Sequence, residues 1–313
     1  MADLAVIILT YNEHLHLARA LHSVRAIAKE IFVVDSFSTD DTAQIAESFG
    51  AVVLQHPFVN QAKQFQWALE NVPIKSEWVM RLDADEVVGT DLQAEIERRL
   101  PLVPAEVTGV NLKRKLVFMD RVIRYGGRGT LILLRIWRRG FANIEDRWMD
   151  EHISVRSGGV LTFEGEFTDH NLNDLTFFVE KHNRYATREA IELLNQHLRF
   201  MPAPSSLLIE RSSFQAAAKR YIKQRIYNRI PFPISSFGYF LYRYVLLLGF
   251  LDGKAGLIYS VLQGFWYRFL VGAKVDELRR SVEHLTDSAE VAREVQRLTG
   301  LTLLGKRERG FIN

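Results

Sequence analysis

Polar side chains suited to metal and nucleotide chemistry follow three apolar runs that have the length of buried strands. The runs at residues 4–9, 31–34 and 77–82 lead into Thr10-Tyr11-Asn12-Glu13, Asp35-Ser36 and Asp83-Ala84-Asp85-Glu86. In an open α/β sheet, ligands bind outside the carboxyl ends of the parallel strands. The three sets are therefore expected to converge on one edge of a sheet and to form a candidate active site there.

The spacing Asp83-x-Asp85 suits a hard divalent cation. Mg²⁺ and Mn²⁺ are commonly held by one or two carboxylates together with the phosphates of a substrate. Asp-x-Asp is frequent on solvated loops, but this pair directly follows a buried strand and has Asp35 at a neighbouring strand end. We expect Asp35 to accept hydrogen bonds from a base or a ribose. Its alternative role, capping the helix near residue 40, suits Thr39 or Asp40 better.

The elements that must position these residues alternate along the first hundred positions. Strand-like runs are separated by segments of helical periodicity, which predicts a parallel sheet covered on both faces. Beyond residue 100 the pattern changes to two longer strands, two short ones, a long helix and a basic helical segment. The expected strands are 4–9, 31–34, 51–54, 77–82, 107–119, 131–137, 153–155 and 160–163, and the expected later helices are 175–198 and 205–229.

Composition limits the class of protein. The chain has 313 residues, of which 48% are hydrophobic, so it can form a large core and two domains are the prior expectation. It contains no cysteine, which excludes disulfides and thiolate metal sites. Because residues 1–3 lead straight into a strand, we expect no signal peptide. The charge is uneven: residues 211–280 hold twelve basic and three acidic residues, whereas residues 1–210 have a net charge of −6.

Two apolar segments in the basic part, 237–251 and 255–273, contain one arginine each, Arg243 and Arg268. Both are shorter than the roughly 20 apolar residues of a spanning helix. Aromatic residues beside basic ones are typical of helices that lie in the interface of an anionic leaflet. The alternatives are a helical hairpin packed on the body or an interface between copies in a homo-oligomer.

Several common catalytic motifs are missing from the sequence. It has no Gly-x-Gly-x-x-Gly after the first strand and no Gly-x-x-x-x-Gly-Lys-Ser/Thr, which disfavours dinucleotide dehydrogenases and P-loop enzymes. It also lacks Gly-x-Ser-x-Gly and His-Glu-x-x-His, which disfavours serine hydrolases and zinc proteases. No nucleic-acid partner is expected.

Three ordered motifs, at residues 6–13, 33–42 and 82–86, resemble glycosyltransferase family 2, of the nucleotide-diphospho-sugar transferase fold. The similar subgroup is the bacterial lipopolysaccharide core β-1,4-glucosyltransferase-like set, whose C-terminal region resembles residues 250–258 and 265–269. The resemblance implies a GT-A-type, mostly parallel sheet sandwiched by helices, with a C-terminal helical membrane-associated region. The domains would then be 1–204, catalytic, and 205–313, basic and aromatic.

The resemblance also implies roles for individual residues of the nucleotide site. The base and ribose pocket would be lined by Thr10, Tyr11, Glu13 and Asp35. Lys63 and Gln66 lie where the family often has an Arg-Asn pair near the nucleotide, from which this sequence departs. Asp83 would touch the ribose or the metal, and Asp85 would ligate Mg²⁺ or Mn²⁺ bridging the diphosphate.

The catalytic base of the family's inverting members is a carboxylate that lies further along the chain. Similar members have Val-His-Glu at the stretch 148–152, which places Glu151 at the base position and leaves Asp150 as the alternative. Arg138 could meet the diphosphate, and His170 could be a further metal or phosphate contact; the alternatives are a charged strand end and a structural histidine.

The function implied is an inverting, metal-dependent transfer of a sugar from a nucleotide sugar, expected to be a UDP-sugar. The acceptor would be a lipid-linked glycan or a lipopolysaccharide core at the cytoplasmic face of the bacterial inner membrane, where the basic region meets anionic lipid. One alternative keeps the fold as a catalytically idle scaffold or a self-association module that uses residues 237–273. Another is a nucleotidyltransferase, but this class usually needs a Gly-rich basic loop that the sequence lacks.

Overall fold

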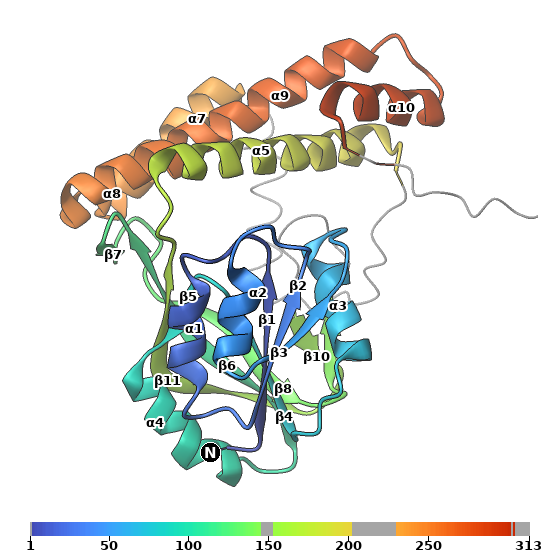
Figure 1. Ribbon diagram of the computed structural model, residues 1–313. Coiled ribbons are helices and arrows are strands. Elements are labelled where there is room, and N and C mark those ends of the chain that lie inside the picture. The colour runs from blue at the N-terminus through green and yellow to red at the C-terminus, as the bar shows by residue number, and fades with distance from the viewer. Residues whose placement is uncertain (1, 145–152, 202–229, 302, 304–313) are drawn as a thin grey trace, which may run out of the picture. The chain divides into compact units, whose positions relative to one another are not determined.

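A computed structural model describes residues 2–144, 153–201, 230–301 and 303 (Figure 1). The chain divides into two compact units, the first comprising Met1–Asp174 and Tyr244–Leu257 and the second Leu175–Arg243 and Ile258–Asn313. This division differs from the predicted domain boundary at residue 204. The long helix at 175–198 belongs to the second unit, and a short segment of the apolar C-terminal region belongs to the first.

The first unit is an α/β sheet with helices on both faces, as the alternating pattern predicts (Figure 1). Its helices are α1 (Leu17–Val24), α2 (Thr42–Ser48), α3 (Gln61–Asn71) and α4 (Thr90–Arg99). Its strands are β1 (Leu4–Thr10), β2 (Glu30–Asp35), β3 (Val52–Gln55), β4 (Trp78–Asp83), β5 (Glu86–Val88), β6 (Val107–Phe118), β7 (Arg121–Ile123), β8 (Leu131–Arg138) and β11 (Gly159–His170). A small separate ladder pairs β9 (Ala142–Ile144) with β10 (Ile153–Val155).

The main sheet is mixed, but six of its nine strands, β1, β2, β3, β4, β6 and β11, run in one direction, as a mostly parallel sheet predicts. Its order is β3-β2-β1-β4-β8-β6-β11-β5, with β7 paired to β6. The strands β3, β2, β1 and β4 run parallel, but β8 is antiparallel to both β4 and β6, and β5 is antiparallel to β11. Helices return the chain between the first four strands, which are all parallel as predicted. Beyond residue 100, where strands follow one another without helices between them, β6 and β11 keep that direction and β8 and β7 run against it.

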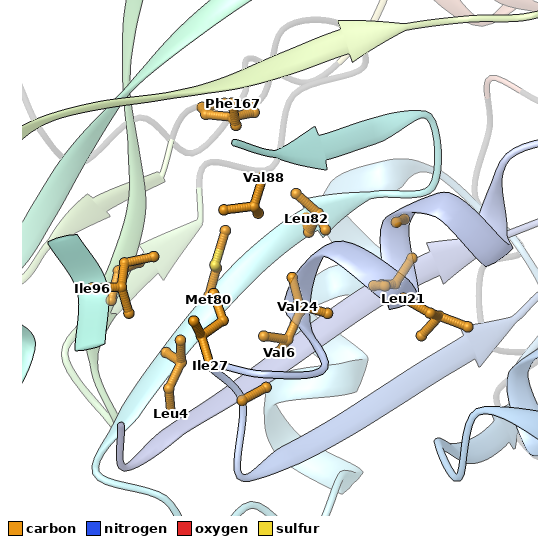
Figure 2. Packing of buried hydrophobic residues seen from close by; sticks show 14 of the residues in the cluster. Leu4, Val6, Leu21, Val24, Ile27, Met80, Leu82, Val88, Ile96 and Phe167 are labelled. Carbon is orange, nitrogen blue, oxygen red and sulfur yellow. The ribbon is translucent and has the colours of Figure 1, made fainter. Parts of the chain in front are cut away.

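The first strand is apolar throughout because both of its faces are covered. Leu4, Val6 and Ile8 face a core formed with α1, α2 and α4, whereas Ala5 and Ile7 face a second core formed with α3. These five side chains are fully buried. Such continuous burial is expected of a parallel strand between two helical layers. Figure 2 shows the first of these cores, with residues of α1 and β4 packed around the first strand.

Strand β11, the last along the chain, is longer than expected. The sequence predicts a short strand that ends at residue 163, but β11 continues through Gly165 to His170. A Cβ atom at Gly165 would lie 2.5 Å from Cα of Leu92, so this glycine permits close packing of β11 on α4 rather than ending the strand. The extension carries Asp169 and His170 to the edge where β4 ends.

The second unit is helical in its described part. It contains α5 (Leu175–Leu198), α7 (Phe232–Leu241), α9 (Tyr267–Val282) and α10 (Ser288–Thr299). Between α7 and α9 the chain forms a π-helix (Tyr242–Leu246), a 3-10 helix (Gly249–Asp252), α8 (Gly253–Tyr259) and a second π-helix (Ser260–Trp266), of which Tyr244–Leu257 belongs to the first unit. Its core joins Ala190 and Leu194 of α5 to Leu278 of α9 and Val295 of α10. The predicted helix at 205–229 lies outside the described residues.

Among the described helices, none is by itself long and apolar enough to cross a membrane. One bent pair, Phe232–Leu246 with Gly249–Val282, passes the same criterion of length and composition when both parts are taken together.

Candidate functional site

The ends of three parallel strands form the centre of the site. β1 pairs with β2 so that Thr10 lies opposite Asp35, and it pairs with β4 so that Leu9 lies opposite Asp83. The polar residues that follow each strand therefore share one edge of the sheet, as the sequence predicts. The carboxyl end of β11 joins this edge through β5, because Asp169 lies opposite Glu86.

Asp35 is completely buried, and its carboxylate accepts hydrogen bonds from other residues of the protein. The hydroxyl of Thr10 donates to Oδ1 at 2.9 Å, the backbone N–H of Ser38 donates to Oδ2 at 2.8 Å, and the Ser38 hydroxyl also donates to Oδ1. In this conformation Asp35 holds the loop after β2 to the end of β1. Its predicted contact with a base or ribose remains a prediction.

Two loops at this edge are tied together and leave two aromatic rings exposed. The N–H of Asn12 donates to the Ser38 hydroxyl at 2.8 Å, and the N–H of Thr39 donates to Oδ1 of Asn12 at 2.9 Å. Tyr11 and Phe37, one on each loop, are 59% and 51% exposed. Exposed aromatic faces at a strand-end crevice are suited to stacking against a planar ligand.

Phe37 also has an unusual backbone conformation. Its φ is 60°, in the left-handed region that bulky residues rarely adopt. Strain of this kind persists only where the surrounding structure enforces it, and it is concentrated at functional sites. Phe37 could not be predicted from the sequence, because an aromatic residue between two serines forms no motif of its own.

Glu13 does not point freely into the site. Its carboxylate lies 2.6 Å from Nδ1 of His16, a buried residue whose Nε2 accepts a hydrogen bond from the backbone N–H of Leu172 at 2.9 Å. Because a backbone N–H can only donate, Nε2 is unprotonated and the ring proton is on Nδ1, facing Glu13. His16 thus connects the loop after β1 to the segment after β11. The spacing of His16 in the sequence does not predict this role.

Helix α3 approaches the site through a different residue from those predicted. Lys63 is exposed, and its backbone N–H donates to Oδ1 of Asn60, the N-cap. Gln66 donates to Glu70 one turn further along the same helix. Neither side chain has a recorded contact with the loops that follow β1 and β2, so their predicted nucleotide contact remains a prediction.

Gln64, between these two residues, points inward. It is 1% exposed, and its Nε2 donates to the Ser36 hydroxyl at 3.2 Å and to the carbonyl of His56 at 3.1 Å. Its Oε1 lies 2.8 Å from Nδ1 of the same histidine, whose ring stacks on Trp67 at 4.3 Å. Gln64 therefore fixes the ends of β2 and β3 relative to α3. A buried glutamine on a helix has no distinct sequence signal, which is why it was missed.

Asp83 and Glu86 flank a tight turn and share one arginine. Nη2 of Arg135 lies 2.6 Å from Oε1 of Glu86 and 3.4 Å from Oδ2 of Asp83. On the other side, Nε of Arg81 donates to Oδ1 of Asp83 at 3.1 Å. Both arginines are less than 10% exposed. Both oxygens of Asp83 are thus engaged by guanidinium groups, and this leaves the aspartate poorly placed to ligate a cation as well.

The two carboxylates have opposite pKa shifts. Burial acts to raise the pKa of Asp83, but the charges of Arg81 and Arg135 outweigh it and hold the pKa well below its usual range. Burial raises the pKa of Glu86 to about 8, because Arg135 opposes it only in part and the neighbouring Asp83 and Asp169 add to it. Near neutral pH the turn therefore carries one ionised and one protonated carboxyl group.

Asp85, at the tip of the same turn, is more available. Its Oδ2 accepts a hydrogen bond from Nδ2 of Asn171 at 3.0 Å, and its backbone carbonyl accepts one from the N–H of His170 at 3.0 Å. His170 is itself oriented by Arg19, which donates to its carbonyl at 2.8 Å, and by Asp120, whose Oδ1 lies 3.3 Å from Nε2. The structure thus brings two of the predicted metal ligands to adjacent strand ends.

Within the described residues, no group of three or more His, Asp or Glu side chains is arranged to hold a metal ion. A cation bound at this edge would therefore need oxygen ligands from a substrate in addition to Asp85 and His170.

Comparisons with known proteins identify the family of the chain. Residues 5–170, more than half of the chain, match the family described as Glycosyl transferase family 2. The chain belongs to glycosyltransferase family 2. The resemblance stated from the three motifs is therefore confirmed at the level of the family.

Curated relatives of this family 2 chain are similar over limited lengths. An uncharacterized glycosyltransferase of Rickettsia felis is 42% identical over 97 residues, covering 31% of this chain and 34% of the relative. One from Rickettsia typhi is 41% identical over 97 residues, covering 31% and 32%. The chain thus spans about a third of the length of these relatives. The lipopolysaccharide core biosynthesis glycosyltransferase LpsC of Rhizobium meliloti is 28% identical over 204 residues, covering 60% and 70%.

Solved structures give a more distant match. Glucosyl-3-phosphoglycerate synthase from Mycobacterium tuberculosis, in complex with Mn²⁺, uridine diphosphate and glucosyl-3-phosphoglycerate, is 20% identical, with a TM-score of 0.30. The match covers 36% of this chain and 44% of that structure.

The structure does not bring the predicted diphosphate contact Arg138 to the strand-end site of this family 2 chain. Arg138 lies opposite Trp78, at the start of β4 and thus at the far end of the strand from Asp83. Its guanidinium group donates to the carbonyls of Val103 and Val107 and pairs with Glu77. Arg138 therefore does not contact the strand-end acids. Arg135, on the same strand, contacts Asp83 and Glu86 instead. The predicted bases Glu151 and Asp150 lie outside the described residues.

Replacing the strained residue Phe37 by glycine should stabilise this family 2 chain. A side chain in the left-handed region costs about 1–2 kcal/mol, whereas glycine adopts that region without steric cost but pays about 0.5–1 kcal/mol of backbone entropy. We expect Phe37→Gly to raise the free energy of unfolding by about 1 kcal/mol, measured by urea denaturation. Phe37→Ala, which removes the ring but keeps Cβ, is the control and should give no gain. Equal destabilisation by both variants would contradict the strain.

The raised pKa of Glu86 should make stability fall with pH. The folded state binds the proton of the Glu86 carboxyl group more tightly than the unfolded chain does. The resulting gain in the free energy of unfolding is complete below the ordinary glutamate pKa and is lost as pH rises through about 8. Between pH 6 and 8.5 we expect the wild type to lose about 2 kcal/mol relative to Glu86→Gln in urea denaturation. Glu47→Gln, at an exposed position of α2, should keep the wild-type slope. An unchanged slope in Glu86→Gln would contradict the shift.

Proposed function

We propose that this chain transfers a sugar from a nucleotide sugar, with a UDP-sugar as the expected donor, to a lipid-linked glycan or lipopolysaccharide-core acceptor, with inversion at the anomeric carbon. The observation that carries the proposal is the shared edge at which β1, β2, β4 and β11 end, in a chain that belongs to family 2. The name of the Rhizobium relative supports the class of acceptor.

The nucleotide is proposed to bind over the ends of β1 and β2. Tyr11 and Phe37 offer exposed rings there for contact with the base. Thr10 and Asp35 lie beneath them and keep the two loops joined, so their contribution is to position the rings. Gln64 supports the same surface from α3 through its hydrogen bond with Ser36.

A divalent cation is proposed to bind at this edge. Asp85 is partly exposed, and among the described residues its carboxylate has one recorded partner, Asn171. Asp85 would hold Mg²⁺ or Mn²⁺, the remaining ligands being diphosphate oxygens, since Asp83 is engaged by Arg81 and Arg135. His170 would join as a ligand only by giving up a contact of its ring, because Nδ1 lies 3.4 Å from Arg19 and Nε2 lies 3.3 Å from Asp120. When bound, such a cation would offset the charge that develops on the departing nucleoside diphosphate.

The acceptor hydroxyl needs a base. A carboxylate, Glu151 or alternatively Asp150, takes the hydroxyl proton as the oxygen bonds to the anomeric carbon and the bond from that carbon to the diphosphate oxygen breaks. One such displacement inverts the anomeric centre. Described residues on either side of these acids, Ile144 and Ile153, are opposite each other in the β9–β10 ladder.

Changing Asp85 should remove metal-dependent donor binding. A donor that binds only the folded state raises the melting temperature, so UDP-glucose with Mn²⁺ should raise it in the wild type and not in Asp85→Asn. Asp3→Asn, at the opposite end of β1, is the matched control and should keep the full shift. EDTA should abolish the wild-type shift. A panel of other nucleotide sugars identifies the donor, and no shift with any of them would overturn the proposed function.

Changing the base should slow transfer without weakening donor binding. We expect Glu151→Gln to lower the rate of radiolabelled sugar transfer into lipid-linked acceptor by about 10²-fold or more, with an unchanged UDP-glucose melting shift. Asp150→Asn should have the smaller effect. A larger effect of Asp150→Asn would exchange the two roles, and wild-type rates in both variants would exclude this pair of residues.

A further inference from the structure

A short apolar segment of the C-terminal region is part of the catalytic unit. Residues Tyr244–Leu257 belong to the first unit, although the chain on either side of them belongs to the second. The segment contains one acid, Asp252, and one base, Lys254, among fourteen residues. The nucleotide site described above makes no use of it, so its exposed surface needs a separate explanation.

Asp252, the only acid of the segment, fixes it to the loop that follows β7. Asp252 is 3% exposed, and its carboxylate accepts hydrogen bonds from the backbone N–H groups of Arg124, at 3.1 and 3.2 Å, and of Tyr125, at 2.9 Å. The N–H of Gly126 donates to the carbonyl of Leu247 at 2.8 Å. Because Asp252 is engaged with backbone groups, it serves to hold the segment in place, and Figure 1 shows α8 (Gly253–Tyr259) beginning beside β7.

Apart from this anchor, the segment presents large apolar side chains to solvent. Six of them are at least 40% exposed, and Leu246 reaches 71%. The six are Val245, Leu246, Leu248, Phe250, Leu251 and Leu257. Single exposed apolar residues are ordinary, but a cluster of this size on one short, anchored segment marks an interaction surface. Leu248 in addition has a φ of 59°, a strained conformation for leucine.

The charges around the cluster indicate what covers it. Arg121, Arg124 and Arg128 on the hairpin and Lys254 within the segment are exposed. These four cations outnumber the one exposed acid nearby in the chain, Asp120. Apolar side chains accompanied by cations match the interfacial region of an anionic bilayer, where the former enter the acyl boundary and the latter meet headgroup phosphates. A two-fold contact between copies would instead bring the same cations face to face, which is unfavourable.

We propose that Tyr244–Leu257 docks the catalytic unit onto an anionic lipid surface. This inference rests on the proposed function, in which the acceptor is lipid-linked. Asp120 lies in the turn between β6 and β7, just before the residues that hold the segment. Its Oδ1 lies 3.3 Å from Nε2 of His170 at the strand-end site. Docking through this segment therefore connects the lipid surface to the hairpin that borders the site, so that a lipid-linked acceptor arrives next to the bound donor.

The test is flotation of the purified full chain with vesicles of phosphatidylcholine, with or without phosphatidylglycerol. We expect the wild type to float with the anionic vesicles and to be released partly by high salt, which screens the cations but not the apolar contact. Leu246→Ser combined with Leu251→Ser should lower the vesicle-bound fraction about fivefold or more. The melting temperature and the UDP-glucose shift should stay unchanged, because both side chains are exposed.

Two matched variants separate this segment from other apolar surfaces. Leu102→Ser removes a 77% exposed leucine elsewhere in the same unit and should leave flotation unchanged. Ile234→Ser with Phe237→Ser removes exposed apolar side chains of α7, in the second unit. This pair should reduce flotation less than the change in Tyr244–Leu257.

Several results would overturn the proposal. They are wild-type flotation by Leu246→Ser with Leu251→Ser, absence of wild-type flotation, or loss of flotation only in the α7 variant. Analytical ultracentrifugation adds one more: a wild-type dimer that becomes a monomer in the double variant would identify the surface as a contact between copies. Flotation without any nucleotide-sugar shift would instead contradict the proposed function and leave the lipid contact standing.

Discussion

Parallel pairing of β1 with both β2 and β4 is the constraint on which the site depends. It sets Thr10 beside Asp35 and Leu9 beside Asp83, so polar groups that are far apart in the sequence end at one edge. Helices on both faces make this pairing stable, because they bury the alternate side chains of β1 in two separate cores. The edge is then the one part of the strand where polar groups can meet a ligand.

Bringing acids together at one edge requires compensation for their charge. Arg81 and Arg135 bind Asp83, and Arg114 lies 3.3 Å from Asp169, so the carboxylates are held by cations within the sheet. The buried carboxyl group of Glu86 is kept protonated instead. Asp83 is thereby held within the protein, and Asp85, in the turn between β4 and β5, is the aspartate proposed to meet a ligand. Spacing alone could not distinguish the two aspartates.

The sequence predicted the elements that depend on local pattern and missed those that depend on long-range packing. The first four strands, α3 and the long α5 follow from apolar runs and helical periodicity. The reversed direction of β8, between β4 and β6, did not, because pairing between strands far apart in the sequence leaves no local pattern. The extension of β11 was missed as well, because it depends on the packing of Gly165 against Leu92. The same holds for the site: the strand-end acids were found, whereas Gln64 and His16 act through distant partners that no spacing reveals.

Backbone strain gives an independent indication of where function constrains this chain. Phe37 and Leu248 are bulky residues in the left-handed region, where glycine would cost less, and both leave their side chains exposed. An exposed side chain contributes little to the core, so folding alone does not account for keeping a bulky residue at either position. The two positions share an exposed side chain on a surface for which a partner is proposed, a nucleotide base for Phe37 and a lipid surface for Leu248. Stability given up at exposed positions is consistent with selection for binding.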